Sequence, residues 1–367
     1  MGGFECSTHR RCDGKRLDMI AATRHDELAT GDYLRLRQQG IGTARDGLRW
    51  HLIERTPGEY DFSSALPMVR AARETGTQVI WDLCHYGWPD WLDIFRPEFV
   101  TRFAQFARAF VRLLTNEDDR VPFITPINEI SFFSWAGGHV GFFNPCVRRR
   151  GRKLKAQLVR AVVEAIEAVW SINPRTRVMQ VDPLINVVAA DPSNARQRRT
   201  AESYRRSQFD AWDMLAGRLL PELGGAMKYM DVLGVNFYST NQWIHEGGAK
   251  IFRGHSQYRP FRHMLKEVYE RYERPLFVAE TGIEDEARPA WLRYVGREVR
   301  GAMRAGVPVE GICLYPIVNH PGWSNERHCR NGLWDYPEGK GGRAVYQPLA
   351  EELRRQRVRF RQFRDND

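Results

Sequence analysis

The chain has 367 residues, of which 43% are hydrophobic and 27% are charged, so it is long enough for a large globular domain. It contains no run of about 18 apolar residues, which excludes a transmembrane helix, and its first sixteen residues lack the apolar segment of a signal peptide. The net charge of +10 is spread along the chain without a recognisable nucleic-acid-binding module. We therefore expect a cytoplasmic protein whose partners include neither nucleic acid nor a membrane, while its oligomeric state stays open.

The six cysteines form no CxxC pair and have no regular spacing; they are Cys6, Cys12, Cys84, Cys146, Cys313 and Cys329. Cys84 and Cys313 lie at or in apolar runs typical of buried strands. This usage indicates reduced thiols in a reducing compartment and no zinc site.

Eight short apolar segments predict strands, and each is followed by a loop and a helical pattern. The predicted strands are 17–22, 41–45, 78–83, 122–126, 177–181, 231–237, 276–279 and 311–315. The predicted helices are 31–39, 64–74, 97–115, 153–170, 203–219, 263–272, 291–305 and 345–363. Strict alternation implies a parallel sheet, and eight units imply a closed (β/α)8 TIM barrel. We expect one α/β domain over 1–367, with 1–16 as a polar N-terminal extension.

Two of these strands deliver a glutamate at their C-terminal tips. The segment ITPINEIS carries Asn128 and Glu129, and PLFVAETG carries Glu280. The loops after the strands build the active site in a barrel, so both carboxylates are expected to face one mouth. Paired carboxylates are the machinery of glycoside hydrolysis, in which one donates a proton and the other attacks or activates water.

Further segments, LCHYGWP, GVNFYS and NGLWDY, follow the strands in register. Together, from about residue 18 to 336, the pattern resembles the retaining β-glycosidases of glycoside hydrolase family 1, which are β-glucosidase-like barrels with catalytic glutamates on strands four and seven. The resemblance implies that Glu129 is the general acid/base and Glu280 is the nucleophile. It implies a carbohydrate or glycoside substrate, and no metal or organic cofactor.

The resemblance also implies a supporting set around the two glutamates. Arg45 would lie near the nucleophile, Tyr238 would donate a hydrogen bond to it, and His85 would contact sugar hydroxyls. Aromatic faces at Trp88, Trp135 and Trp323 are candidates for stacking on sugar rings. The complete supporting set is Arg45, His85, Asn128, Asn236, Tyr238, Tyr315 and Trp323.

Retaining chemistry makes two physical demands on such a pair. The carboxyl groups must lie about 5–5.5 Å apart. Glu129 must be protonated at rest, which requires a pKa raised by partial burial and by the neighbouring carboxylate.

The sequence departs from the family pattern at several positions. The strand-eight glutamate that holds outer hydroxyls of a glucose-type ring falls at Gly322, and the strand-eight tryptophan becomes Tyr315. The first-strand glutamine has no clear counterpart in ATRHDEL, where His25 or Asp26 is a candidate substitute. These departures leave the two-carboxylate chemistry in place and the identity of the sugar open.

The basic cluster from Arg148 to Lys155 fits either a solvated loop and helix start or a site for an anionic aglycone. Three alternatives to a hydrolase remain open at this point: a transglycosidase using the same residues, a non-catalytic carbohydrate-binding barrel, and a polyanion-binding protein.

Overall fold

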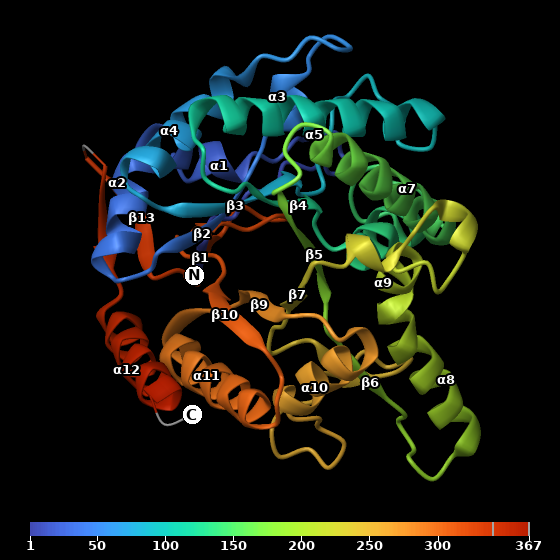
Figure 1. Ribbon diagram of the computed structural model, residues 1–367. Helices are drawn as coiled ribbons and strands as arrows, with labels where there is room; N and C mark the ends of the chain where they lie inside the picture. The colour runs from blue at the N-terminus through green and yellow to red at the C-terminus, as the bar shows by residue number, and fades with distance from the viewer. Residues whose placement is uncertain (340, 366–367) are drawn as a thin grey trace.

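Eight parallel strands close into a barrel, and helices surround it (Figure 1). The computed structural model describes residues 1–339 and 341–365. Around the barrel the strands follow the order β1-β10-β9-β7-β5-β4-β3-β2. Their bounds are β1 Gly2–Gly3, β2 Thr43–Gly47, β3 Gln78–Cys84, β4 Phe123–Ile127, β5 Arg177–Pro183, β7 Val232–Asn236, β9 Leu276–Thr281 and β10 Val309–Leu314. The predicted (β/α)8 architecture is confirmed.

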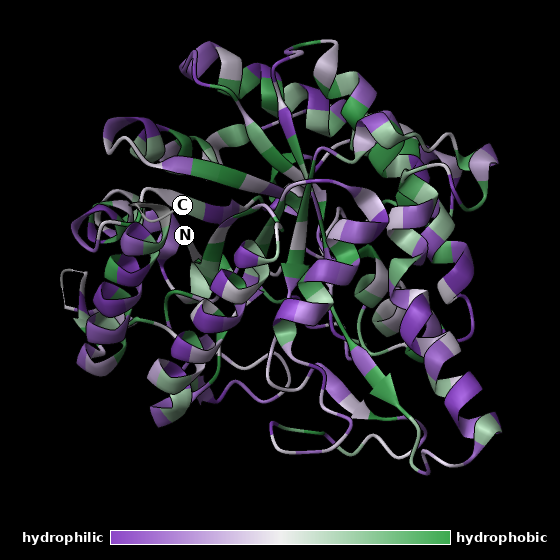
Figure 2. Ribbon diagram, turned by 60° about the horizontal axis from the view of Figure 1, so that its bottom comes forward, coloured by the Kyte–Doolittle hydropathy of each residue, from purple (hydrophilic) through white to green (hydrophobic). Residues whose placement is uncertain are grey.

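The helices pack one apolar face against the barrel and turn a polar face outward, as the colouring in Figure 2 shows. On the longest, the phenylalanines of the 97–110 stretch are all buried. The helices are α1 Met19–Ala22, α2 His25–Gln38, α3 Trp50–Ile53, α4 Leu66–Glu74, α5 Pro97–Glu117, α6 Ile130–Phe133, α7 Gly151–Trp170, α8 Ala195–Arg206, α9 Asp210–Leu215, α10 Phe261–Tyr272, α11 Arg288–Arg304 and α12 Gln347–Asp365. Within the described residues, no helix is both long and apolar enough to cross a membrane.

Three two-stranded sheets lie outside the barrel, in the connections that follow barrel strands. They pair β6 Asn186–Val188 with β8 Gln242–Ile244, β11 His320–Pro321 with β12 His328–Cys329, and β13 Trp334–Glu338 with β14 Gly342–Val345.

The prediction for the first strand was wrong. Residues 17–22 contain the short helix α1, whose N-cap Asp18 accepts a hydrogen bond from the Ala21 amide. The first barrel strand is the glycine pair of β1, which is hydrogen-bonded to β2 and β10. A side chain at Gly3 would place its Cβ 2.2 Å from the Tyr315 ring, so this closely packed seam requires glycine.

The prediction that 1–16 forms a polar extension was also wrong, because this segment contains the first barrel strand. The chain from Gly2 to His9 is buried throughout, and it closes the barrel. The first strand was not recognised in the sequence because two glycines form no hydrophobic pattern.

Along each barrel strand, successive side chains point alternately into the barrel and outward toward the helices. Ile80 belongs to a small apolar cluster with side chains from β5, β7 and β9, and Asp82, two residues further along β3, lies above that cluster. Arg45 on β2 and Asn236 on β7 are likewise fully buried near the C-terminal ends of their strands. An apolar layer therefore fills the lower barrel, and a polar layer forms the floor of its C-terminal mouth.

The expectation of reduced thiols was wrong for two of the six cysteines. Cys12 forms a disulfide with Cys146, 134 residues later, and this bond ties the chain after β1 to the long connection between β4 and α7. The other four cysteines are free and buried, as expected for Cys84 and Cys313. Disulfides persist chiefly in oxidising environments, so the cytoplasmic location remains only a prediction.

Candidate active site

A cleft of about 1310 Å³ opens at the C-terminal mouth of the barrel. Both predicted glutamates line it, and their exposed fractions are only 8% for Glu129 and 5% for Glu280. The two carboxylates thus reach one cavity from β4 and β9, as the strand register predicted.

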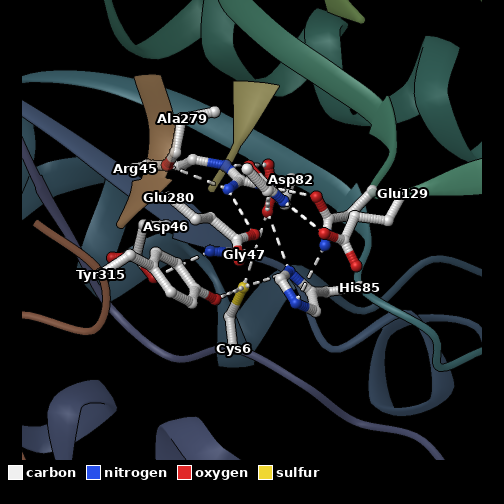
Figure 3. A network of polar contacts seen from close by, with 12 residues as sticks. Cys6, Arg45, Asp46, Gly47, Asp82, His85, Glu129, Ala279, Glu280 and Tyr315 are labelled. Carbon is white, nitrogen blue, oxygen red and sulfur yellow. Dashed lines mark hydrogen bonds and ion pairs between the residues drawn. The ribbon is translucent and has the colours of Figure 1, made fainter. Parts of the chain in front are cut away.

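Glu280 is held by one cation and one hydroxyl. Arg45 Nη1 lies 2.6 Å from Glu280 Oε1, and the Tyr238 hydroxyl donates to Oε2 at 2.8 Å. Arg45 is fully buried and also binds Asp82 through two nitrogens, at 3.1 and 2.7 Å (Figure 3). It also donates to the Asn128 side-chain oxygen at 2.6 Å. This charge network fixes the Glu280 carboxylate and compensates its negative charge.

Glu129 lies in the opposite kind of environment. It accepts hydrogen bonds from the Tyr86 hydroxyl at 2.6 Å and from the Asn236 amide group at 2.8 Å, and the described residues offer it no cation in direct contact. Burial, followed by the negative charge of Glu280, raises the pKa of Glu129 to about 7. Glu129 and Glu280 are therefore electrostatically distinct.

The backbone at Glu129 is left-handed, with φ at 49°, where the chain leaves β4 and enters α6. Its amide donates to the Val181 carbonyl of β5 at 3.0 Å, and its carbonyl accepts from the Phe133 amide. A non-glycine residue held in this region stores strain, and such strain is common where a side chain must be aimed into a site.

A second chain of hydrogen bonds lies beneath the cleft floor. Asn128 Nδ2 is 2.9 Å from the Tyr86 hydroxyl and 3.2 Å from His85 Nε2, and His85 Nδ1 is 3.0 Å from Asp82 Oδ2. Although burial alone lowers the pKa of His85, the Asp82 hydrogen bond and the nearby carboxylates outweigh it and raise that pKa. The Asn128 side-chain nitrogen is thus held by Tyr86 and His85, while its oxygen accepts from Arg45, and these contacts fix the orientation of the amide.

The structure brings all nine predicted site residues to this mouth. Five line the cleft directly: Glu129, Glu280, His85, Tyr238 and Trp323. The other four lie buried just behind them: Arg45, Asn128, Asn236 and Tyr315. Tyr315 stacks parallel to His85 with ring centroids 6.0 Å apart.

Three candidate residues do not line the cleft, namely Trp88, His25 and Asp26, whereas Trp135 does. Trp88 is buried and donates its indole N–H to the Leu92 carbonyl, so it is a core residue. His25 lies fully buried between Asp32 and Asp46, and Asp26 pairs with Arg49. Trp135 lines the cleft and is 44% exposed.

The residue that the sequence interpretation missed is Glu5, which follows the true first strand and enters the cleft. The Ser7 amide donates to Glu5 Oε1 at 3.0 Å, and the Ser7 hydroxyl contacts the same oxygen. Burial alone raises the pKa of Glu5, but the charges of His85 and His320 and the Ser7 hydrogen bonds lower it overall. Had the first strand been assigned to Gly2–Gly3, Glu5 would have followed its C-terminal end and been a candidate site residue.

Tyr86 and His320 were also missed. Tyr86 stands beside His85 within LCHYGWP, and its contact with Glu129 depends on a positive φ of 68° that no sequence pattern signals. His320 lines the cleft from β11, next to the predicted strand-eight positions.

Cys6, Asp82 and His85 lie close enough together to suggest a metal site. Arg45 binds both Asp82 oxygens, however, and burial, together with the Asp82 charge, raises the pKa of the Cys6 thiol well above its usual value. A cation would have to displace the guanidinium, so this set fits a metal poorly.

The outer part of the cleft is aromatic and basic. Its walls include Trp135, Tyr204 and Trp243, together with the cations Arg152 and Lys250. Lys250 lies over the Trp243 ring, 4.8 Å from the centroid, and Arg152 makes no ion pair within the described residues.

No family model matches the sequence, and no curated protein resembles it at the level of sequence. Solved structures do resemble it in fold. A β-glycosidase from Pyrococcus horikoshii is 18% identical, with a TM-score of 0.76, and the match covers 91% of this chain and 85% of that one. The AHE enzyme from Alicyclobacillus herbarius is 17% identical, with a TM-score of 0.77 and coverage of 92% and 87%.

A third similar structure is the β-glucosidase from Thermotoga maritima in complex with glucoimidazole. It is 17% identical, with a TM-score of 0.75, and the match covers 90% of this chain and 86% of that one. A structure of a family 1 β-glucosidase from Thermotoga maritima is also similar in fold, with 16% identity and a TM-score of 0.73. At these identities the likeness establishes the fold, which is that of the family 1 β-glycosidase barrel.

Proposed function

We propose that this protein is a retaining β-glycosidase that works by double displacement. The observation that carries the proposal is the difference between two carboxylates in one cleft. Glu280 is paired with Arg45 and hydrogen-bonded by Tyr238, whereas Glu129 has a pKa raised to about 7. One acid is suited to attack and the other to proton donation.

In the first step, a Glu280 oxygen attacks the anomeric carbon while Glu129 gives its proton to the departing glycosidic oxygen. A covalent glycosyl ester forms on Glu280 and the aglycone leaves as an alcohol. In the second step, Glu129 takes a proton from water, the water oxygen attacks the same carbon, and the ester bond breaks. Both carboxylates return to their starting states.

We propose that Glu5 takes part in holding the sugar. It lies in the cleft near His85 and His320, close to the region where Gly322 replaces the family's glutamate. A charged acceptor at this position favours sugars that present hydroxyl donors and disfavours an acidic sugar ring.

The aglycone is proposed to be the anionic part of the substrate. Arg152 and Lys250 line the outer cleft, and Lys155 is held 3.4 Å from Asp210. A sugar alcohol seated there in place of water would give transglycosylation with the same residues, and the roomy outer cleft favours this as the second candidate.

The test is hydrolysis of a panel of aryl β- and α-glycosides by the wild type and by Glu280→Gln. Release from a β-glycoside that is lost in the variant supports the proposal and identifies the sugar. A matching 2-deoxy-2-fluoro glycoside should leave a mass adduct on the peptide containing Glu280, and an adduct elsewhere would overturn the assignment. Transferred products in the presence of added alcohols would distinguish a transglycosidase.

A further inference from the structure

The connection from β4 to α7 exposes an unusual amount of apolar surface beside the cleft. Trp135 is 44% exposed, Val140 40% and Phe142 51%. Among the residues that the structure describes, only eight large apolar side chains are exposed, and three of them fall in this short stretch. Exposed apolar side chains close together on a surface are candidates for an interaction site.

These side chains are held outward by a rigid backbone. The Phe142 amide donates to the Ala136 carbonyl at 2.7 Å, and the disulfide from Cys146 to Cys12 anchors the end of the stretch. The neighbouring Phe143 is fully buried and pairs by its backbone with Arg11. Val140 and Phe142 therefore remain exposed in a stretch that is otherwise packed.

Unpaired cations lie directly beside this apolar surface. The Arg149 amide donates to the His139 carbonyl at 3.0 Å, so the returning chain runs alongside the stretch that carries Val140. Arg148 and Arg149 are both exposed, and within the described part of the chain neither forms an ion pair or a side-chain hydrogen bond. We call residues 135–149 the β4–α7 rim.

We propose that the β4–α7 rim docks the protein on an anionic phospholipid membrane. Apolar side chains that enter the headgroup region, flanked by arginines that meet lipid phosphates, are the combination that binds such a surface reversibly. Trp135 and His139 of the rim also line the cleft, so docking would turn the mouth of the barrel toward the membrane. This proposal departs from the expectation that no membrane is a partner, which was drawn from the lack of a spanning segment and did not consider peripheral docking.

The proposal goes beyond the glycosidase assignment and does not depend on it. Together with the proposed function, it implies that the natural substrate is presented at a membrane surface. A polyanion such as nucleic acid is the weaker occupant, because phosphodiester chains gain little from Val140 and Phe142, whereas an acyl boundary buries them.

The chain offers a matched control surface on α12. Val358 is 52% exposed there, and Arg359 and Arg361 are exposed beside it. This helix lies on the far side of the barrel from α7 (Figure 1). It has comparable charge and a single exposed aliphatic residue.

The test is co-sedimentation of the full chain with vesicles of phosphatidylcholine alone and of phosphatidylcholine mixed equally with phosphatidylglycerol. The wild type should bind only the mixed vesicles. Val140→Ser with Phe142→Ser should weaken binding by at least about tenfold, and each of Arg148→Gln and Arg149→Gln by roughly fivefold. Val358→Ser with Arg359→Gln and Arg361→Gln should leave binding unchanged.

Two controls keep the result interpretable. Circular dichroism should show that every variant is folded, and hydrolysis of a soluble glycoside, if present, should be the same in rim variants and wild type. Failure of the wild type to bind mixed vesicles would overturn the proposal. So would equal loss in the α12 variant, or displacement from vesicles by duplex DNA combined with indifference to the Val140 and Phe142 changes, which would identify a polyanion site instead.

Discussion

The hydroxyl of Tyr86 donates a 2.6 Å hydrogen bond to Glu129 Oε2, and it is the shorter of the two side-chain hydrogen bonds that the carboxyl group accepts. The bond favours the charged form of Glu129, while burial and the charge of Glu280 favour the neutral form. The pKa of about 7 is the balance of these effects, so Tyr86 is a residue through which the acid/base can be tuned.

Tyr86→Phe is expected to raise the pKa of Glu129, because a hydrogen bond to the carboxylate form is lost. The alkaline limb of kcat/KM against pH, measured with an activated aryl glycoside, should move upward by about half to one pH unit. Tyr60→Phe is the matched control, since the buried Tyr60 hydroxyl has no partner in the described structure. A limb that stays in place or moves to lower pH would contradict the role of Tyr86.

Glu129→Gln is expected to stabilise the protein at alkaline pH. The pKa of Glu129 is about 7 in the folded state and its ordinary value is 4.5, so folded molecules bind more protons than unfolded ones between these values. The free energy of unfolding of the wild type should therefore fall as pH rises through that window, a loss that glutamine does not suffer. Urea unfolding at pH 8 should favour the variant by on the order of 1–2 kcal/mol.

The same comparison at pH 4 should remove most of that difference, since Glu129 is then mostly protonated in both states. Glu74→Gln, at an exposed position on α4, should show little effect at either pH. A variant less stable than the wild type at pH 8 and unchanged at pH 4 would refute the electrostatic explanation.

Glu5→Gln should change which sugars are accepted. Removing the charge weakens hydrogen bonds from neutral sugar hydroxyls, and kcat/KM for the preferred neutral glycoside should fall by about 10- to 100-fold. Uronides should lose less, because the repulsion between their carboxylate and Glu5 disappears. The measurement is the ratio of kcat/KM for paired glucuronide and glucoside substrates, and Ser7→Ala should shift it in the same direction by less.

An unchanged ratio in Glu5→Gln would show that the carboxylate does not contact the sugar. The Ser7 variant separates this from a folding defect, since it leaves the Glu5 side chain in place and removes one hydroxyl donor.

Loss of the disulfide should destabilise the protein. The bond closes a loop with a sequence separation of 134, so replacing Cys12 and Cys146 by serine should lower the free energy of unfolding by about 2–5 kcal/mol. A reducing agent should lower the thermal midpoint of the wild type to that of the double variant and leave the variant unaffected. Equal sensitivity of both proteins to reductant would mean that the cysteines are not paired.

Much of the barrel could be predicted because seven of its eight strands carry a local signal. The apolar stretches at β2, β3, β4, β5, β7, β9 and β10 overlap the predicted segments. The carboxylates could be placed because the parallel strands put Glu129 and Glu280 at the same end of the sheet. The prediction that they share one cleft therefore followed from the hydrophobic pattern of the strands and the parallel topology alone.

The rest depended on contacts that no local pattern encodes. β1 consists of two glycines, which are required there because Leu36 and Tyr315 pack too closely for any side chain. The left-handed backbone at Tyr86 and the pairing of Cys12 with Cys146 depend on residues distant in sequence. Glu5 was overlooked because its strand was assigned too late in the chain.

The shortness and position of β1 have a consequence during protein synthesis. This strand is synthesised well before its partner β10, which spans Val309–Leu314. A nascent chain therefore cannot close its barrel, or fix Glu5 in place, until β10 has been translated. Fragments of this protein that terminate between β9 and β10 would carry both Glu129 and Glu280 and still lack a closed barrel.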